Sequence, residues 1–467
     1  MNINDFKTSK MTVVAFLLIG TIIFGNFAIV EKFFLGVVPT YYRVIIPIMF
    51  FLFFLKKNSS GLSKEKTTKS VDIVNVFYFV IVIWLIYGII SLILSPWTVF
   101  NDGLKELMCI TLGLFSVYII IELCERGQFK YMIVALKITI CISLIIGYIE
   151  VFTGVHLSTS MLSDPMYLER LQQLYPQRNY SESFKYIATG FFYNPNDYCA
   201  FLSIFAPVLL YFDNFSSAVL KFMNYFSLAL ISMMLLIDDA IICIIALIIS
   251  LLFYLIFDKA PIKRWVIIAV AFFSPRVIGN SVIWFITSII NKVTGNTIVI
   301  HDVDMSNVEL AVAVQTENMA QETGSLFLRI NTYVESIKEM FLNSKGLGLG
   351  AGSFSNFFGQ ISEDKNMMSN PHSLWIEILA QYGIIIFSMV VIVLIVIFIR
   401  LVLENKKHKN NGVILVMAMG ISFIFASFAP SSFLKGTYYW ILFGLALGLL
   451  SSTNCTNSIR GVIKSEK

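Results

Sequence analysis

The stretch IIIFSMVVIVLIVIFI, residues 384–399, contains no charged residue and belongs to a segment long enough to cross a bilayer as a helix. Similar apolar runs recur along all 467 residues, of which 57% are hydrophobic and only 13% charged. A soluble domain has about one-quarter charged residues, so a soluble enzyme is excluded. The short alternating segments of a membrane β-barrel do not occur. The chain is therefore predicted to be an all-α polytopic membrane protein with a single membrane domain, 1–467.

About twelve transmembrane helices are expected from the lengths of these runs. They cover residues 11–30, 41–55, 73–95, 104–121, 130–152, 191–212, 222–237, 240–257, 265–290, 384–403, 412–429 and 433–450. Lysine and arginine collect in the loops near 56–69, 259–264 and 406–409 and in the C-terminal tail. The positive-inside rule makes these loops and both termini cytoplasmic.

Two long loops then face outward: 153–190, and a large, partly helical loop over 291–383. In GSLFLRINTYVESIKEMF (324–341) apolar residues recur at helical spacing, which predicts an amphipathic helix. Arg329 lies beside that apolar face. Its guanidinium group suits a diphosphate, and the alternative is an interfacial arginine that pairs with a nearby acid.

The segment NPHSLWIEILAQYG, residues 370–383, precedes the opening stretch. Asn370 is a suitable N-cap and Pro371 a suitable first residue, which makes His372 the second residue of a short helix at the outer surface. That helix should lead into the span that starts near Ile384. The helix dipole would favour a neutral imidazole at His372, and the free N–H groups of the first turn would favour an anion.

GFFYNPNDYCAFL, residues 190–202, repeats this pattern. Asn194 can cap, Pro195 can start the helix, and Asn196 and Asp197 fill the first turn. Two Asn-Pro helix starts are thus expected to open toward the outer leaflet. They either aim their N-termini at an anionic group, as discontinuous membrane helices do, or are simply well-capped interfacial helices.

Several other residues near the predicted outer face have more than one interpretation. Arg276, behind a proline in an apolar segment, is a functional residue inside the membrane or marks a break in that span. Arg178 and Lys185 could reach a bound headgroup or be solvated. The turn Asp238-Asp239 suggests a general base or a cation site, with a polar turn as the alternative. The glycine run 344–354 lacks the spacing of a nucleotide loop and is interpreted as a close-packing turn.

GLGLGAGSF (346–354), followed by NPHSLWIEILAQYG with its glycine eleven residues after the histidine, resembles the signature of the O-antigen ligase and Wzy-type polysaccharide polymerase superfamily. GFFYNPNDYCAFL resembles a second segment of that superfamily. Teichuronic-acid-type polymerases look nearest. The sequence resemblance covers about 187–212 and 324–400. Elsewhere only the arrangement of the predicted spans and loops matches.

The resemblance implies a glycosyltransferase of the bacterial cytoplasmic membrane. It would polymerise polyprenyl-diphosphate-linked oligosaccharide repeat units into a cell-surface polysaccharide on the outer face. His372 and Arg329 match the superfamily's catalytic residues. The substrate-binding candidates are Arg276, Arg178, Lys185, Asn194, Asn196 and Asn370. Many members have a Ser-Arg pair where this chain has Asp238-Asp239, so Arg276 or Arg178 would have to replace that arginine.

The donor carries its own leaving group, so no cofactor is expected, and the outer acids lack metal-ligand spacing, so catalysis is expected to be metal-independent. The expected partners are the lipid-linked donor, the growing glycan and the bilayer; a flippase and a chain-length regulator are candidates, and nucleic acid is not. The alternatives are O-antigen-ligase-type transfer of finished glycan to a lipid or protein acceptor, or a polysaccharide flippase or exporter. A peptidoglycan glycosyltransferase is a further alternative, whose motifs are not found in the sequence.

Overall fold

The structure, a computed structural model, describes residues 10–25, 40–59, 73–167, 169, 187–211, 217–275, 325–361, 370–430, 434 and 436–452. In these ranges the regular elements are helices, so the all-α prediction is confirmed. They are α1 Lys10–Phe24, α2 Tyr41–Ser59, α3 Ile73–Leu94, α4 Phe100–Glu125, α5 Phe129–Thr153, η3 Met161–Ser163, α8 Pro195–Phe205, η4 Ala206–Leu210, α9 Ala218–Ile237, α10 Ile241–Phe257, α13 Ser325–Ser344, α14 Phe354–Ile361, α15 Leu374–His408, α16 Asn411–Ala426 and α17 Tyr438–Ser451.

Apart from η3, α13 and α14, these helices overlap the predicted spans. Five of them, α3, α4, α5, α9 and α15, are long and apolar enough to cross a membrane, and shorter apolar helices accompany them. The chain is thus a multi-pass, all-helical membrane protein. The ninth predicted span, 265–290, is helical over 262–275, and its remainder lies outside the described residues. The number of about twelve therefore stays a prediction.

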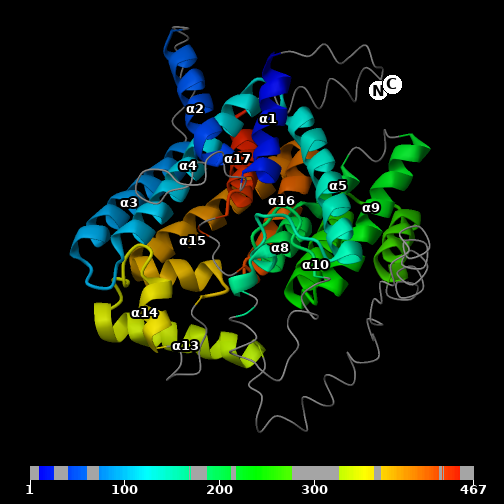
Figure 1. Cartoon of the computed structure of the whole chain (residues 1–467). Helices are drawn as coiled ribbons and strands as arrows, with labels where there is room; N and C mark the ends of the chain where they lie inside the picture. Colours follow the sequence, from blue (N-terminus) through cyan, green and yellow to red (C-terminus); the bar gives the residue numbers. More distant parts are fainter. Residues whose placement is uncertain are drawn as a thin grey trace.

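Helix α8 lies inside the bundle rather than at its surface. It packs against α5, α9, α10 and α16, and every residue from 198 to 210 is buried. In Figure 1 it lies between the long helices, with η4 continuing it. The N-terminus of α8 therefore opens within the protein, where a charge or polar group interacts more strongly than in water.

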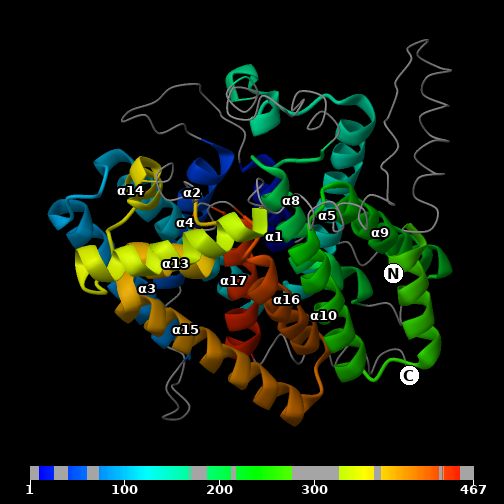
Figure 2. The same ribbon diagram turned by 90° about the horizontal axis from the view of Figure 1, so that it is seen from below.

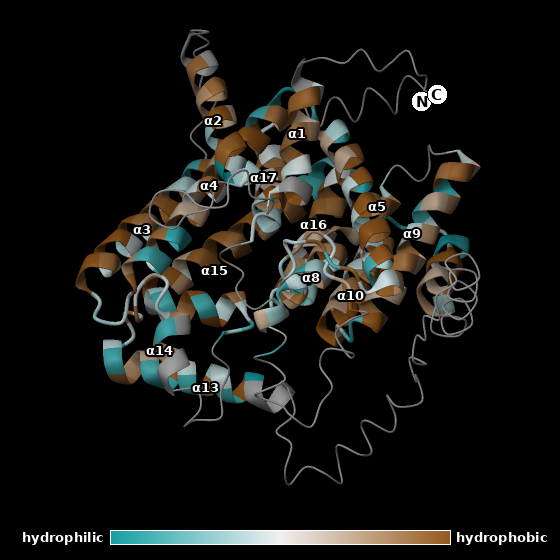
Figure 3. Cartoon of the chain, in the orientation of Figure 1, coloured by the Kyte–Doolittle hydropathy of each residue, from teal (hydrophilic) through white to brown (hydrophobic). Residues whose placement is uncertain are grey.

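Helices α13 and α14 lie across one end of the bundle (Figure 1, Figure 2). Both fall within the predicted large outer loop, and α13 confirms the helix expected over 324–341. Coloured by hydropathy, the long helices are mainly brown, whereas α13 and α14 mix teal and brown (Figure 3). The described part of the large outer loop is thus less apolar than the long helices.

Candidate functional site

Helix α8 begins as its Asn-Pro pair predicts. The Oδ1 atom of Asn194 accepts a hydrogen bond from the backbone N–H of Asp197 at 2.9 Å, and Pro195 is the first helical residue. The Nδ2 atom of Asn194 donates to Oδ2 of Asp197 at 2.8 Å. Asn194 is buried, whereas Asn196 is half-buried. Asn194 therefore positions the start of the helix, and Asn196 is the more accessible of the two to a ligand.

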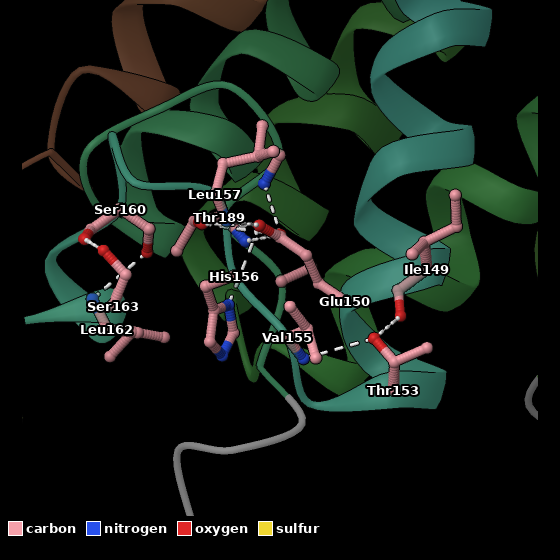
Figure 4. Close-up of polar contacts among 12 residues, drawn as sticks. Ile149, Glu150, Thr153, Val155, His156, Leu157, Ser160, Leu162, Ser163 and Thr189 are labelled. Atoms are coloured by element: carbon pink, nitrogen blue, oxygen red, sulfur yellow. Dashed lines mark hydrogen bonds and ion pairs between the residues drawn. The ribbon is translucent and has the colours of Figure 1, made fainter.

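The chain that leads into α8 is held by the buried carboxylate of Glu150 on α5 (Figure 4). Its Oε2 atom accepts hydrogen bonds from the N–H groups of Thr189 and Gly190, both at 2.7 Å. Its Oε1 atom accepts one from the N–H of Leu157 at 3.4 Å and lies 3.7 Å from Nδ1 of His156. Glu150 is not among the site residues predicted from the sequence. Its position within an apolar span could have identified it, because an acid in such a span is usually functional or paired with another group.

A second acidic side chain, that of Asp238, holds the neighbouring residue of the same loop. Its Oδ1 atom accepts from the N–H of Ala188 at 2.9 Å, and its Oδ2 atom from the thiol of Cys199 at 3.3 Å. Burial raises the pKa of Asp238 to about 8, although the Ala188 and Cys199 bonds oppose the shift. Two acidic side chains thus bind three consecutive N–H groups, 188–190. Of the two interpretations of Asp238-Asp239, these contacts favour the polar turn.

The second Asn-Pro pair does not start a helix, so that prediction is wrong. Helix α15 begins at Leu374, and its N-cap is Ser373, whose hydroxyl accepts from the N–H of Ile376 at 3.5 Å. Asn370 is half-buried and lies in the bend before the helix. His372 has φ 46, in the left-handed region, which histidine tolerates better than most residues. The chain therefore turns at His372, and Ser373 becomes the cap because it comes directly after that turn.

The imidazole of His372 contacts the segment that follows α16. Its Nδ1 atom lies 3.4 Å from the carbonyl oxygen of Ala429. A carbonyl only accepts, so this contact places the proton on Nδ1 and leaves the lone pair on Nε2. Burial lowers the pKa of His372 to about 4, and the positive charge of Arg329 contributes, against the opposing Ala429 bond. The imidazole is neutral at pH 7, as predicted, although burial rather than the helix dipole is the main cause.

Arg329 reaches the same segment from α13. Its Nη1 atom donates to the carbonyl oxygen of Phe428 at 3.1 Å. Its Nε atom is buried and has no hydrogen-bond partner in the described part of the chain. One turn later, the hydroxyl of Tyr333 donates to the backbone carbonyl of His372 at 3.2 Å. A buried donor without a partner is costly, so this Nε–H, unpartnered among the described residues, is a candidate donor to an anionic ligand.

A break in α15 at Gly383 separates the short helix from the span. Gly383 has φ 75 and ψ 178, a conformation open almost only to glycine. A Cβ atom at this position would lie 2.4 Å from the carbonyl of Leu347. The predicted change from a short helix to a span starting near Ile384 is thus confirmed.

The glycine run fills the space that this break opens. The N–H groups of Leu349 and Gly350 donate to the carbonyls of Ala380 and Gln381, each at 2.8 Å. From the end of α3, the hydroxyl of Ser95 donates to the carbonyl of Leu349. Since the run leads directly from α13, these bonds fix α13 relative to α15, and so Arg329 relative to His372.

Two acids, the half-buried Asp197 and the buried Glu377, lie in the first turns of α8 and α15 and interact electrostatically. The Oε2 atom of Glu377 accepts from the N–H of Leu434 at 3.3 Å. The sequence shows Glu377 in a polar stripe with Ser373 and Gln381, which we expected on a helix at the outer surface. All three are instead buried. The polar stripe therefore faces the protein interior beside the candidate site.

The remaining predicted cations, Arg276, Arg178 and Lys185, lie outside the described residues. Their positions relative to Arg329 therefore stay predictions. Among the residues that the structure places, no group of three or more His, Cys, Asp or Glu side chains could hold a metal ion.

Comparison with known proteins supports the resemblance. The chain is 26% identical over 386 residues to the teichuronic acid biosynthesis protein TuaE of Bacillus subtilis (strain 168). The alignment covers 79% of this chain and 70% of the relative. The chain matches no protein-family model. The predicted resemblance to teichuronic-acid-type proteins is thereby confirmed.

Proposed function

We propose that this chain is a membrane glycosyltransferase that polymerises polyprenyl-diphosphate-linked repeat units into a cell-surface polysaccharide. Its similarity to TuaE, named for teichuronic acid biosynthesis, supports a role in making a polysaccharide. One structural observation carries the rest of the proposal. Arg329 and His372, which match the superfamily signature, are held on the adjacent carbonyl groups of Phe428 and Ala429.

In the proposed reaction, a sugar hydroxyl oxygen of the acceptor attacks the anomeric carbon of the donor. The bond between that carbon and the diphosphate oxygen breaks, and its electron pair leaves with the diphosphate. The hydroxyl proton passes to Nε2 of His372, which is neutral and holds its lone pair there. A general base of this kind contributes typically about 10²–10⁴-fold in rate. The proposal requires neither a nucleotide nor a metal ion.

Arg329 is proposed to stabilise the departing diphosphate. Its Nη1 atom is already bound to Phe428, which fixes the plane of the guanidinium group, and its Nε–H is the donor left for a phosphate oxygen. The half-buried side chains of Asn196 and Asn370 are proposed to bind the substrate beside it. Arg276, Arg178 and Lys185 stay candidates for a second cation.

The charge distribution along α15 supports a site on the outer face. The helix follows His372 at one end and carries Lys406, Lys407 and His408 in its last turn. The two ends of a spanning helix lie at opposite membrane surfaces, and basic ends favour the cytoplasm. His372 is therefore proposed to lie outside, which would place the reaction on the outer face of the cytoplasmic membrane.

The test uses cells that depend on this chain for their polysaccharide. His372→Ala and Arg329→Ala variants, shown to be inserted at normal amount, should accumulate single repeat units on the carrier lipid. Full-length polymer in both variants would overturn the assignment of the site. Deletion of the gene distinguishes the ligase alternative, because loss of a ligase would leave long polymer attached to the carrier.

A further inference from the structure

Helix α13 exposes several large apolar side chains and buries several polar ones. Ile330, Val334 and Phe341 are 52%, 56% and 50% exposed. On the other face, Thr332 and Ser336 are fully buried where α13 packs against α15. A helix at the surface of a soluble protein has the opposite arrangement. The outward face of α13 therefore does not suit water.

Both ends of α13 are tied to ends of membrane helices. At its C-terminal end, the carbonyl of Gly346 accepts from the N–H of Ile384, where the span of α15 begins. Near its N-terminal end, Arg329 donates to the carbonyl of Phe428, just beyond the end of α16. The helix has 20 residues, which corresponds to about 30 Å. It therefore runs across the ends of these helices, and Figure 1 and Figure 2 show it lying across one end of the bundle.

The apolar face of α13 continues into the apolar surface of α15. Leu342 and Leu347 are 68% and 53% exposed, and Ile384 and Ile385 at the start of the span are 48% and 58% exposed. A Cβ atom built at Gly346 would lie within 4 Å of both Phe341 and Ile384, so the two surfaces adjoin. A spanning helix exposes such residues to lipid, so the occupant of the adjoining face is lipid as well.

We propose that α13 is an interfacial helix whose outward face lies among the acyl chains of the outer leaflet. Lys338 fits this placement. Its side chain is 56% exposed and pairs with Glu335 at 3.3 Å, so its ammonium group can extend from the edge of the helix toward the headgroups. A helix with one apolar face and a charged edge binds a bilayer in this orientation.

This placement has a consequence for Arg329, which rests on the proposed function. Arg329 is on the same helix, so insertion of Ile330 and Val334 holds its guanidinium group near the depth of the lipid phosphates. A polyprenyl diphosphate anchored in the outer leaflet presents its phosphates at that depth. Helix α13 would thus align the donor with His372 by embedding in the leaflet that carries the donor.

The experiment incorporates the photo-cross-linking residue benzoylphenylalanine into the full-length protein, in vesicles of phosphatidylglycerol and phosphatidylethanolamine. The variants are Val334→benzoylphenylalanine and Phe341→benzoylphenylalanine. Ile385 on the span is the lipid-facing control position, and Glu335 on the charged edge of α13 is the matched control. After irradiation, intact-protein mass spectrometry measures phospholipid adducts. Variants are compared only when their thermal denaturation matches that of the unmodified protein.

We expect phospholipid adducts at positions 334 and 341 in a yield that matches position 385, and a large loss of yield at 335. Cross-links between two copies of the chain at position 341 would overturn the proposal in favour of a protein interface. Adducts at 385 without adducts at 334 and 341 would show that the face lies in water. Neither result depends on catalysis, so the proposed function is tested separately by the polymer made in His372→Ala cells.

Discussion

Arg329 and His372 come from different helical segments and are held by neighbouring carbonyl groups. Nη1 of Arg329 lies 3.1 Å from the oxygen of Phe428, and Nδ1 of His372 lies 3.4 Å from the oxygen of Ala429. The N–H of Leu374 donates to the next carbonyl along, that of Ser427, at 3.0 Å. The short segment after α16 is thus a common support for both proposed catalytic groups. Each side chain uses one nitrogen for this support, and the other, Nε of Arg329 or Nε2 of His372, is the one proposed to contact the substrate.

Replacement of His372 by glutamine should remove the proton acceptor. The amide of the new side chain could keep a hydrogen bond to Ala429, so the local structure should persist while the rate of polymerisation falls by about 10²–10⁴-fold. The measurement is the initial rate with a lipid-linked donor in vesicles. His408→Gln is the matched control, because His408 lies at the other end of α15 beside Glu404. Equal rates for the two variants would exclude His372 as the base.

The pH dependence should report the low pKa of His372. Burial and Arg329 bring that pKa from 6.5 to about 4, so the base stays neutral well below pH 6.5. We expect kcat/KM to hold from neutral pH to well below 6.5 and to fall only as pH approaches 4. The same group contributes stability that is fully present above pH 6.5 and is lost as pH falls through the folded pKa. An acid limb centred near 6.5 would show instead that His372 is solvated in the working enzyme.

The sequence predicts the helices well because each span carries its own signal, an apolar run of the required length. It also predicts the cap of α8 and the break before Ile384, since Asn194 and Gly383 act through their own backbone neighbours. The first turn of α15 was misplaced because Asn370 and Ser373 are both good caps. Choosing between them requires the contact of His372 with Ala429, and that contact joins distant segments.

The role of Asp238 depends on tertiary structure in the same way. The sequence around Asp238 would be the same whether its side chain were solvated or bound to a distant backbone group. In the structure it binds the N–H of Ala188, which lies 50 residues away in sequence. The sequence also does not determine whether the apolar face of the amphipathic helix points inward or outward. The spacing of Ile330 and Val334 shows that the helix has an apolar face, and only the packing of α13 on α15 shows that this face points outward.

Replacement of Arg329 by lysine keeps the positive charge and removes the planar guanidinium group with its several N–H donors. A single ammonium group cannot bind Phe428 and a phosphate in the same geometry, and a hydrogen bond to a charged group contributes about 1.5–3 kcal/mol. We expect Arg329→Lys to lower kcat/KM by roughly 10–100-fold, and Arg329→Ala to lower it further. Arg400→Lys, at an exposed position on the span of α15, is the control. Full activity in Arg329→Lys would mean that charge alone suffices.

Replacement of Gly383 by alanine should disrupt the contact between the two halves of the site. The backbone conformation costs a non-glycine residue about 1–3 kcal/mol, and the new Cβ would meet the carbonyl of Leu347 at 2.4 Å. We expect a lower thermal denaturation midpoint in detergent and loss of polymer, because α13 would shift relative to α15. Gly420→Ala is the control, since a Cβ there meets nothing within 4 Å and alanine favours a helix by about 1 kcal/mol. A Gly383→Ala protein as stable as the Gly420→Ala protein would contradict this account.

Replacement of Asp238 by asparagine tests whether this carboxylate positions the loop or takes part in the reaction. Asparagine keeps an oxygen for the N–H of Ala188, so Asp238→Asn should retain most activity. Asp238→Ala leaves that N–H without its acceptor and should lose about 1–3 kcal/mol of stability. Activity lost in Asp238→Asn without loss of stability would assign Asp238 to the chemistry instead.

A pH titration of the same variants makes the test more specific. Folding raises the pKa of Asp238 from 3.8 to about 8. The contribution of this group to stability is therefore fully present below pH 3.8, the pKa in the unfolded chain, and is lost as the pH rises through 8. The thermal denaturation midpoint of the wild type should therefore fall across that range. Asparagine cannot ionise, so Asp238→Asn should lose this alkaline fall while its midpoint at lower pH stays near that of the wild type. An unchanged alkaline fall in Asp238→Asn would assign the titration to another group.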